Sequence, residues 1–381
     1  MKIAQILPAA LPAQTANSIQ GMKMAQAFVQ AGHDLRVIAP GRDPNLPWPE
    51  LAKQYGLSTQ FAIRWLPRSG IWLSYDYGLR AVFRARHWGA DLVYTRLPQA
   101  AAYAAWTGLR TVFEVHDLPA RRMASRLMNI FLEGAGAVRL VAITQALADA
   151  FEKQFPLPDR EGFLLVAPDG VDLDRYQDLP TPGAARAALE LPERFTAGYT
   201  GHLYAGRGIE LMLEMAGLRS EINFLLVGGR PEDIACAQDA AQRLGLKNLT
   251  LTGFVPNADL PLYQAASDVL LMPYQSRVAA SSGGDIAAYL SPMKMFEYLA
   301  SGRPILASDL PVFGEVLDHQ NAIILPPADA DAWVAALDRL QASAHQRKTL
   351  AAAARKTVQQ YTWEKRAERI LRGLTQSSPT I

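Results

Sequence analysis

One stretch of the chain reads Ser291-Pro-Met-Lys-Met-Phe-Glu-Tyr-Leu-Ala-Ser-Gly-Arg-Pro-Ile-Leu-Ala-Ser-Asp309. Its pattern predicts a loop, an amphipathic helix, a sharp stop and a buried strand. Ser291 is a suitable N-cap. Pro292 suits the first helical position because a backbone N–H there makes no intrahelical hydrogen bond, so proline loses none. Gly302 ends the helix, and Pro304 prevents its continuation.

This helix carries one lysine and one carboxylate, Lys294 and Glu297, which lie three residues apart and therefore on one face. A helix N-terminus with a lysine beside it is a natural anion site. The carboxylate could accept hydrogen bonds from a pair of hydroxyls, and a phosphate together with a diol indicates a nucleotide. The alternative is a solvated ion pair on a surface helix, and the stretch alone leaves both interpretations open.

The same alternation of strand and helix extends outward over the chain. An apolar run over residues 2–8, a helical pattern over 18–31 and a strand over 35–39 form a β-loop-α-β unit, typical of a parallel sheet. The pattern starts afresh at residue 196, after a proline-bearing segment. The sequence therefore predicts an α/β protein with two doubly wound, Rossmann-like domains, residues 1–176 and 194–360, joined by a linker over 177–193. In such sheets ligands bind beyond the carboxyl ends of the strands, so we expect the ligand in a cleft between the two domains.

The bulk composition limits the function. The chain has 381 residues with a formal net charge of +2, so nothing indicates a nucleic-acid partner. Basic residues exceed acidic ones only in the first half, which is compatible with an anionic lipid or acceptor. A single cysteine excludes an intramolecular disulfide and a cysteine-based metal cluster. We see no signal peptide and no run of about 20 apolar residues, so we expect a cytoplasmic protein that works, at most, at the inner face of the membrane.

Four motifs in order resemble those of the family-4 retaining glycosyltransferases of the GT-B fold, over nearly the whole chain. The glycine loop is Thr200-Gly-His-Leu-Tyr-Ala-Gly-Arg-Gly208, and Leu226-Val-Gly-Gly229 resembles the strand-end turn near the base. Gly253-Phe-Val-Pro256 is similar to the segment that reads the base through its backbone, and residues 291–308 resemble the second glutamate helix. The resemblance implies a GT-B architecture in which residues 361–381 form a helix that crosses back to the first domain.

The resemblance also implies a set of site residues. Lys294 and Arg207 would hold the donor diphosphate, Glu297 the ribose, and His116 would lie near the transferred sugar; we take His116, Arg207 and Lys294 as catalytic. Arg96, Arg121 and Arg122 are candidates for the acceptor side. The donor-binding candidates are Gly201, His202, Arg207, Gly229, Val255, Asp285, Tyr289, Leu290, Ser291, Lys294 and Glu297.

Two positions depart from the family pattern. The first carboxylate of the family's glutamate pair falls on Tyr289, and Asp285 is the nearby carboxylate that could replace it. His202 stands in the glycine loop where many relatives have an arginine. The sugar specificity, and even catalytic competence, therefore depend on residues that the pattern does not supply.

The expected reaction transfers a sugar from a nucleoside diphosphate sugar, a UDP-sugar first of all, to a hydroxyl of a glycan or lipid-linked acceptor with retention at the anomeric carbon. No second carboxylate is placed as a nucleophile, so we expect front-face attack. We expect no cofactor and no metal site. Two alternatives remain open: a sugar-nucleotide epimerase of similar fold, and a non-catalytic relative that binds a nucleotide sugar. The missing Gly-x-Gly-x-x-Gly fingerprint disfavours a nicotinamide-dependent oxidoreductase.

Overall fold

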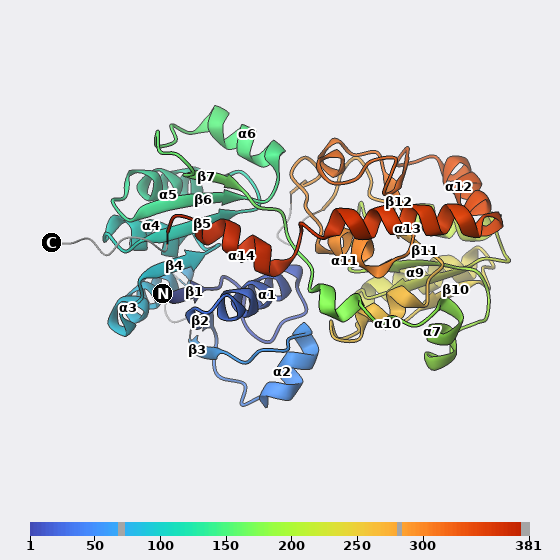
Figure 1. Cartoon of the computed structure of the whole chain (residues 1–381), viewed down its shortest axis with the longest axis horizontal. Coiled ribbons are helices and arrows are strands. Elements are labelled where there is room, and N and C mark those ends of the chain that lie inside the picture. The colour runs from blue at the N-terminus through green and yellow to red at the C-terminus, as the bar shows by residue number, and fades with distance from the viewer. Residues whose placement is uncertain (68–72, 280–283, 375–381) are drawn as a thin grey trace. The chain divides into compact units, whose positions relative to one another are not determined.

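The computed structural model describes residues 1–67, 73–279 and 284–374 (Figure 1). The chain divides into two compact units. Unit 1 comprises Met1–Asp169 and Trp363–Ile381, and unit 2 comprises Gly170–Thr362. Each unit is built around one parallel sheet, so the prediction of two doubly wound α/β halves is confirmed.

Unit 1 has a seven-stranded sheet in the order β3-β2-β1-β4-β5-β6-β7, with every neighbouring pair parallel. The order reverses between β1 and β4, and ligands of doubly wound sheets bind at such a switch point. The strands are β1 (Lys2–Ile6), β2 (Asp34–Pro40), β3 (Ala62–Leu66), β4 (Leu92–Thr95), β5 (Thr111–Val115), β6 (Ala137–Ala142) and β7 (Leu164–Val166).

The helices of unit 1 are drawn around this sheet in Figure 1. They are α1 (Ala16–Gln30), α2 (Trp48–Tyr55), α3 (Leu73–Trp88), α4 (Pro98–Trp106), α5 (Arg122–Glu133), α6 (Gln145–Gln154) and α14 (Trp363–Leu371). The caps follow the sequence: Thr15 accepts from the Ser18 amide at the start of α1, and Thr144 accepts from the Leu147 amide at the start of α6. Helix α14 is the last helix that the structure describes, yet it packs against α1.

Unit 2 has a six-stranded parallel sheet in the order β10-β9-β8-β11-β12-β13, so its switch point lies between β8 and β11. The strands are β8 (Thr196–Thr200), β9 (Asn223–Val227), β10 (Leu249–Leu251), β11 (Val269–Met272), β12 (Ile305–Ser308) and β13 (Ile323–Leu325). The helices are η1 (Leu173–Tyr176), α7 (Pro182–Ala188), α8 (Ile209–Leu218), α9 (Pro231–Arg243), α10 (Leu260–Ala265), α11 (Met293–Ser301), η2 (Pro311–Glu315), α12 (Ala330–Ala342) and α13 (Ala344–Val358).

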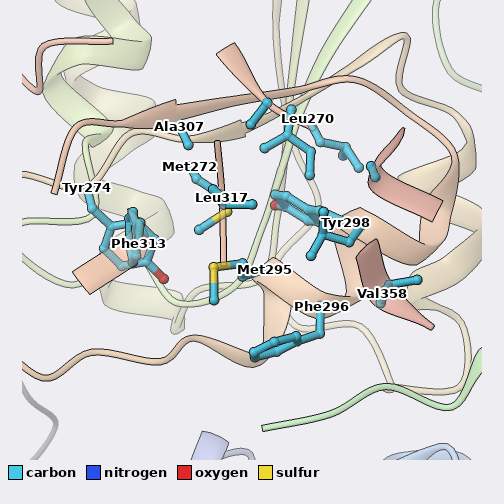
Figure 2. Packing of buried hydrophobic residues seen from close by; sticks show 14 of the residues in the cluster. Leu270, Met272, Tyr274, Met295, Phe296, Tyr298, Ala307, Phe313, Leu317 and Val358 are labelled. Carbon is cyan, nitrogen blue, oxygen red and sulfur yellow. The ribbon is translucent and has the colours of Figure 1, made fainter. Parts of the chain in front are cut away.

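Helix α11 is fixed by the core of unit 2. Met295 and Tyr298 point from α11 toward Met272 and Leu270 of β11, as Figure 2 shows, and all four side chains are buried. Phe296 contacts the ring of Tyr361 at a centroid distance of 5.2 Å. The apolar residues of α11 are packed in the core, and this packing fixes the rotation of the helix about its axis. It therefore also fixes the directions in which Lys294 and Glu297 point.

The structure corrects the expected linker. Residues 177–193 belong to unit 2 and include α7, whose Thr181 accepts a hydrogen bond from the Ala184 amide. Arg186 is 6% exposed and pairs with Asp268 at 2.8 Å and Glu193 at 2.7 Å. Pro182 occupies a first-turn position, where proline is tolerated, so the prolines of this segment bound a helix. The boundary of unit 1 accordingly lies at Asp169, not at residue 176.

The C-terminal region also differs in detail from its prediction. The helix in this region, α14, begins at Trp363, is short, and belongs to unit 1, whereas residues 361 and 362 still belong to unit 2. Beyond Leu374 the predicted helix over 361–381 lies outside the described residues. None of the helices in the described ranges combines the length and the apolar character that crossing a membrane would require.

Candidate functional site

The candidate site of unit 2 lies at its switch point, where β8 and β11 end. The loop after β8 contains Gly201 and leads to α8, and α11 begins close to the same strand ends. Tyr298 of α11 joins the two elements because its hydroxyl accepts a hydrogen bond from the Thr200 amide at 2.7 Å. This contact fixes the helix against the end of β8.

Lys294 is the central cation of this site. Its Nζ lies 3.6 Å from the ring centroid of Tyr199 and 5.4 Å from that of Tyr274. The nitrogen is buried and has no hydrogen-bond partner within residues 1–67, 73–279 and 284–374. Burial and the neighbouring Arg207 hold the pKa of Lys294 well below its usual range, although Glu297 raises it. Burial disfavours the charged form of this lysine, and an anion bound beside it would favour that form.

Arg207 is the second cation at this place. Its Cζ lies 4.9 Å from the ring centroid of Tyr274, so Tyr274 is flanked by both cations. Burial lowers the pKa of Arg207, but Tyr274 and Tyr199 together raise it by more. The net shift is upward, so the guanidinium stays charged. The predicted proximity of Arg207 and Lys294 is present in the structure.

Glu297 lies one helical turn from Lys294 and is held by a neighbour. Its Oε2 accepts a hydrogen bond from Gln264 Nε2 at 3.3 Å, and the same amide reaches Thr200 Oγ1 at 3.3 Å. Glu297 is only partly buried. The carboxylate is therefore oriented by Gln264 while its other oxygen can accept hydrogen bonds from a ligand.

The start of α11 differs from its prediction. The helix begins at Met293 with Pro292 at the N-cap, one residue later than expected, and no side chain caps it. Ser291 is 7% exposed, and its Oγ has no hydrogen-bond partner among the residues that the structure describes. Leu290 is buried beside it, in the same core cluster as Met295. An uncapped helix start with a buried, unsatisfied hydroxyl is a suitable anion contact.

Two of the predicted glycines are required by close approaches. A Cβ on Gly201, whose φ is +136°, would come within 2.6 Å of Lys294 Nζ. A Cβ on Gly229, whose φ is +92°, would meet the Leu203 side chain at 2.9 Å. Gly201 therefore makes room for the lysine, whereas Gly229 shapes the turn after β9.

The remaining candidates of unit 2 around the base lie on loops. Val255 packs its side chain against the cluster of Leu225 and Val227, which leaves its backbone as the group that could face a ligand. His202 stacks on Tyr204 with centroids 4.7 Å apart and rings 5° from parallel. Arg230 lies over the same tyrosine at 5.1 Å.

Asp285 and Tyr289 belong to the segment before α11. The Asp285 Oδ1 accepts hydrogen bonds from the amides of Val278 and Ala287, at 2.9 and 3.0 Å. These bonds hold the pKa of Asp285 below its usual range. The carboxylate thus fastens its own loop in the structure. Tyr289 is half-buried, and its amide donates to the Ile286 carbonyl at 3.1 Å.

Unit 1 brings two of its four predicted residues together. His116 Nε2 lies 2.6 Å from Glu114 Oε1, and Arg96 Nε lies 4.0 Å from the same oxygen. Burial and Arg96 lower the pKa of His116 from 6.5 to about 4, although Glu114 raises it. Arg121 and Arg122 are exposed at the start of α5 and make no ion pair in the described part of the chain.

Sequence reasoning missed the residues that support these groups. Glu114 was hidden in an apolar strand, and its signal was a lone carboxylate within Thr-Val-Phe-Glu-Val. Gln264, Tyr199 and Tyr274 could not be recognised from their spacing in the sequence, because they come from separate elements. Within the described residues, no group of three or more His, Cys, Asp or Glu side chains is arranged to hold a metal ion.

Comparison with known proteins gives consistent matches. Residues 194–343 match the model of the glycosyl transferases group 1, and residues 22–175 match that of the glycosyltransferase family 4. The D-inositol 3-phosphate glycosyltransferase of Saccharomonospora viridis is 28% identical, over 80% of this chain and 68% of its own length. The phosphatidyl-myo-inositol mannosyltransferase of Mycobacterium leprae is 23% identical over 98% of this chain and 96% of its own.

Solved structures share the fold over the full length. HepE of Anabaena, crystallised in complex with UDP and glucose, superposes with a TM-score of 0.77 at 18% identity, and covers 99% of this chain and 100% of its own.

Proposed function

We propose that this chain, which belongs to the family-4 glycosyltransferases of the GT-B fold, uses a nucleoside diphosphate sugar as donor and transfers the sugar with retention of the anomeric configuration. The observation that carries the proposal is the side-chain nitrogen of Lys294, which is buried without a hydrogen-bond partner in the described residues. An unneutralised buried cation is costly unless a ligand compensates it. A diphosphate would do so.

The parts of a nucleotide-sugar donor correspond to groups of unit 2. Lys294, Arg207 and the uncapped start of α11 would bind the diphosphate, and Glu297, oriented by Gln264, would accept the ribose hydroxyls. The backbone of Val255 would read the base. HepE was crystallised with UDP and glucose, which supports a uridine nucleotide as the first donor to test.

The same cations serve the chemistry. In front-face transfer the bond between the anomeric carbon and the phosphate oxygen breaks, and its electron pair passes to the diphosphate. The acceptor oxygen then bonds to the anomeric carbon, and its proton passes to the departing phosphate. Because negative charge gathers on the leaving group, Lys294 and Arg207 would stabilise the transition state. No metal ion is needed for this charge balance.

The donor can be identified by binding. A thermal-shift screen of UDP-, GDP- and ADP-sugars should raise the melting temperature with one base only, because a ligand of the folded state stabilises by mass action. Glu297→Ala should weaken that nucleotide at least about tenfold, the loss of charge-assisted hydrogen bonds. Glu214→Ala, an exposed glutamate of α8, is the matched control. Unchanged affinity in Glu297→Ala would overturn the ribose assignment.

Product analysis tests the reaction itself. With the identified donor and an acceptor mixture, NMR of the product should show the anomeric configuration of the donor retained. An inverted product would overturn the stereochemistry. Formation of an epimerised nucleotide sugar without acceptor would indicate the epimerase, and binding without any turnover would indicate a non-catalytic relative.

Two helices of unit 1 expose apolar side chains of the kind that would contact a lipid-linked acceptor. Helix α4 packs against both α3 and α5, which expose Leu79, Phe83, Met123 and Ile130 at 42%, 62%, 48% and 41%. Arg84 and Arg126 are exposed on the same two helices. Apolar side chains with basic neighbours bind anionic bilayers. We therefore propose that this face contacts an anionic membrane surface.

Vesicle sedimentation tests the membrane contact. The protein should sediment with vesicles that contain phosphatidylglycerol and remain soluble with phosphatidylcholine alone. The double change Phe83→Ser and Ile130→Ser should reduce sedimentation several-fold, because both lose apolar contact area. Leu218→Ser with Leu244→Ser, two exposed leucines of unit 2, is the matched control. Equal loss in both double variants would contradict the assignment of the surface.

A further inference from the structure

A buried cluster of charged side chains lies in unit 1 at the ends of β4 and β5, next to the switch point between β1 and β4. It contains Glu114 and Arg366, whose side chains are 0% and 2% exposed and pair at 2.9 Å. Arg96 and Asp169 lie on either side, 4.0 Å from Glu114 and 3.9 Å from Arg366. His116 is the most exposed of these side chains, at 24%, and Arg96 follows at 15%.

Glu114 is saturated with hydrogen-bond donors. Its Oε1 accepts from Gln20 Nε2 at 2.6 Å and contacts His116 Nε2 at 2.6 Å. Its Oε2 accepts from Arg366 Nη2 at 2.9 Å and from the hydroxyl of Tyr94. Burial alone raises the pKa of Glu114, but Arg366, His116 and Arg96 hold it well below its usual range. The carboxylate is therefore ionised and can only accept.

Arg366 is fixed independently of Glu114. Its Nε donates to the Pro168 carbonyl at 2.9 Å, and its Nη2 donates to the Ala167 carbonyl at 3.0 Å. The residue comes from α14 and is 252 positions from Glu114 along the chain. Helix α14 thus supplies the counter-charge for a carboxylate of strand β5.

The charges of this cluster determine the protonation of His116. Because the ionised Glu114 can only accept, Nε2 of the ring must carry a proton. A second proton would put a positive charge in a buried place beside Arg96 and Arg366. Burial first, and then these two cations, lower the pKa of His116 to about 4, although Glu114 raises it. Asp169, whose pKa burial raises to about 6, and Tyr94 are the other titratable groups of the cluster. Neutral imidazole with its proton on Nε2 leaves Nδ1 with a lone pair.

We propose that Glu114 and Arg366 are positioning residues that hold His116 as the neutral tautomer protonated on Nε2, so that Nδ1 accepts a hydrogen bond from a substrate hydroxyl. The hydroxyl as ligand rests on the proposed function, whereas the proton position does not. The role parallels that of a carboxylate which orients a catalytic imidazole. His116 thus recognises a hydroxyl as an acceptor and supplies no positive charge to the diphosphate.

NMR of the unliganded protein labelled with ¹⁵N-histidine tests the proton position. We expect the His116 ring, assigned by its loss in His116→Asn, to be protonated on Nε2 only between pH 6 and 8. Protonation on Nδ1, or on both nitrogens in this range, would overturn the proposal. The spectrum needs no nucleotide sugar, so absence of turnover with every donor would remove the proposed function and leave this result standing.

Variants of the positioning residues test their effect on the reaction. Glu114→Gln should shift His116 toward the tautomer protonated on Nδ1, because the new amide can donate to Nε2. It should lower kcat by about 10- to 100-fold, with nucleotide affinity unchanged, since the nucleotide-binding residues belong to unit 2. Glu114→Asp should restore part of kcat, and Glu133→Gln, an exposed glutamate of α5, should change nothing. Unaltered tautomer and kcat in a folded Glu114→Gln would contradict the role.

Discussion

At the scale of single residues, Lys294 shows how a motif becomes a site. Its position three residues before Glu297 was visible in the sequence, but a solvated ion pair explained that spacing equally well. The structure instead places Lys294 Nζ 3.6 Å from the ring centroid of Tyr199, and Gln264 holds the carboxylate of Glu297. The side-chain nitrogen of Lys294 has no hydrogen-bond partner in the described residues, and an anionic ligand would favour its charged form.

We expect nucleotide binding to take up a proton at Lys294. Burial and Arg207 depress the pKa of Lys294 in the unliganded protein, and a bound diphosphate would raise it. Affinity should therefore weaken as pH rises, by up to about tenfold per pH unit between the two pKa values. Calorimetry in two buffers that differ in ionisation enthalpy measures the uptake directly.

Two variants check the source of this proton. Lys294→Met should weaken binding and abolish the uptake, whereas Lys247→Met, at an exposed lysine of unit 2, should leave both unchanged. Affinity that does not depend on pH in the unmodified protein would contradict the prediction.

His116 should make the fold sensitive to acid. Its pKa falls from 6.5 to about 4 on folding, so the stability that it contributes is present above pH 6.5 and is lost as pH falls to about 4. The loss amounts to roughly 2 to 3 kcal/mol. Asp169 has the opposite effect on stability. Its pKa is raised to about 6 because burial disfavours the ionised form, so protonation of Asp169 as the pH falls favours the folded state.

Denaturant titrations from pH 7 to pH 4 isolate the histidine. His116→Gln should lose less stability over this range than the unmodified protein, while His319→Gln, at an exposed histidine, should follow the unmodified protein. Asp169 is present in all three chains and cancels. Parallel curves for all three proteins would rule out the assigned pKa shift.

At the scale of elements, the glycine loop of unit 2 is held by the chain after β11. The Gly206 carbonyl accepts from the Gln275 amide at 2.9 Å, and the Ala205 carbonyl accepts from the Ala279 amide at 3.1 Å. Gly208 precedes α8 with a φ of +82°, and a Cβ there would come within 2.0 Å of the Pro273 carbonyl oxygen. The loop that carries Arg207 is thus held by backbone hydrogen bonds to the chain after β11. The two backbones approach closely because Gly208 has no side chain.

Two glycines of this region should respond oppositely to alanine. Gly208→Ala should destabilise unit 2 by about 2 kcal/mol or more, because both the backbone conformation and the contact with Pro273 oppose a Cβ. Gly217→Ala, within α8, should be neutral or stabilise by about 0.5 to 1 kcal/mol, since its nearest atom would lie at 3.7 Å. Chemical denaturation measures both, and destabilisation of similar size in the two variants would contradict the argument.

Local signals identified most elements but not their supporting contacts. Thr144 was recognisable as a helix cap, and Gly302 as a helix end with a φ of +69°. The segment over 177–193 was predicted as a linker because it contains several prolines. In the structure these prolines lie around a helix, and sequence alone does not distinguish the two cases. Glu114 was passed over because a buried carboxylate shows its role only once its donors, Gln20, Tyr94 and Arg366, are known.

At the scale of the whole molecule, the two units differ in chain continuity. Unit 2 is one uninterrupted segment, residues 170–362, whereas unit 1 is completed by α14 from the end of the chain. Without α14, Glu114 would be buried without Arg366. Breaking such a pair costs about 3 to 5 kcal/mol, a large part of the stability of a domain.

The units should therefore behave differently when separated. A fragment of residues 170–362 should fold cooperatively and bind the nucleotide that the whole chain binds, because its sheet, core and donor residues are complete. A fragment of residues 1–169 should unfold without a cooperative transition, and a peptide of residues 363–374 added in trans should restore one. Circular dichroism melts measure both, and a stable, cooperative 1–169 fragment would contradict the role assigned to Arg366.

The sequence by itself determined the α/β class, the two parallel sheets and the helix that carries Lys294 and Glu297, because hydrophobic periodicity, caps and breakers act over a few residues. Tertiary structure alone decided that residues 177–193 belong to unit 2 and that Tyr199 and Tyr274 surround the lysine. It also decided that Arg366 neutralises Glu114 beside His116. These contacts join residues tens to hundreds of positions apart, and burial sets their charge states, so no local pattern records them.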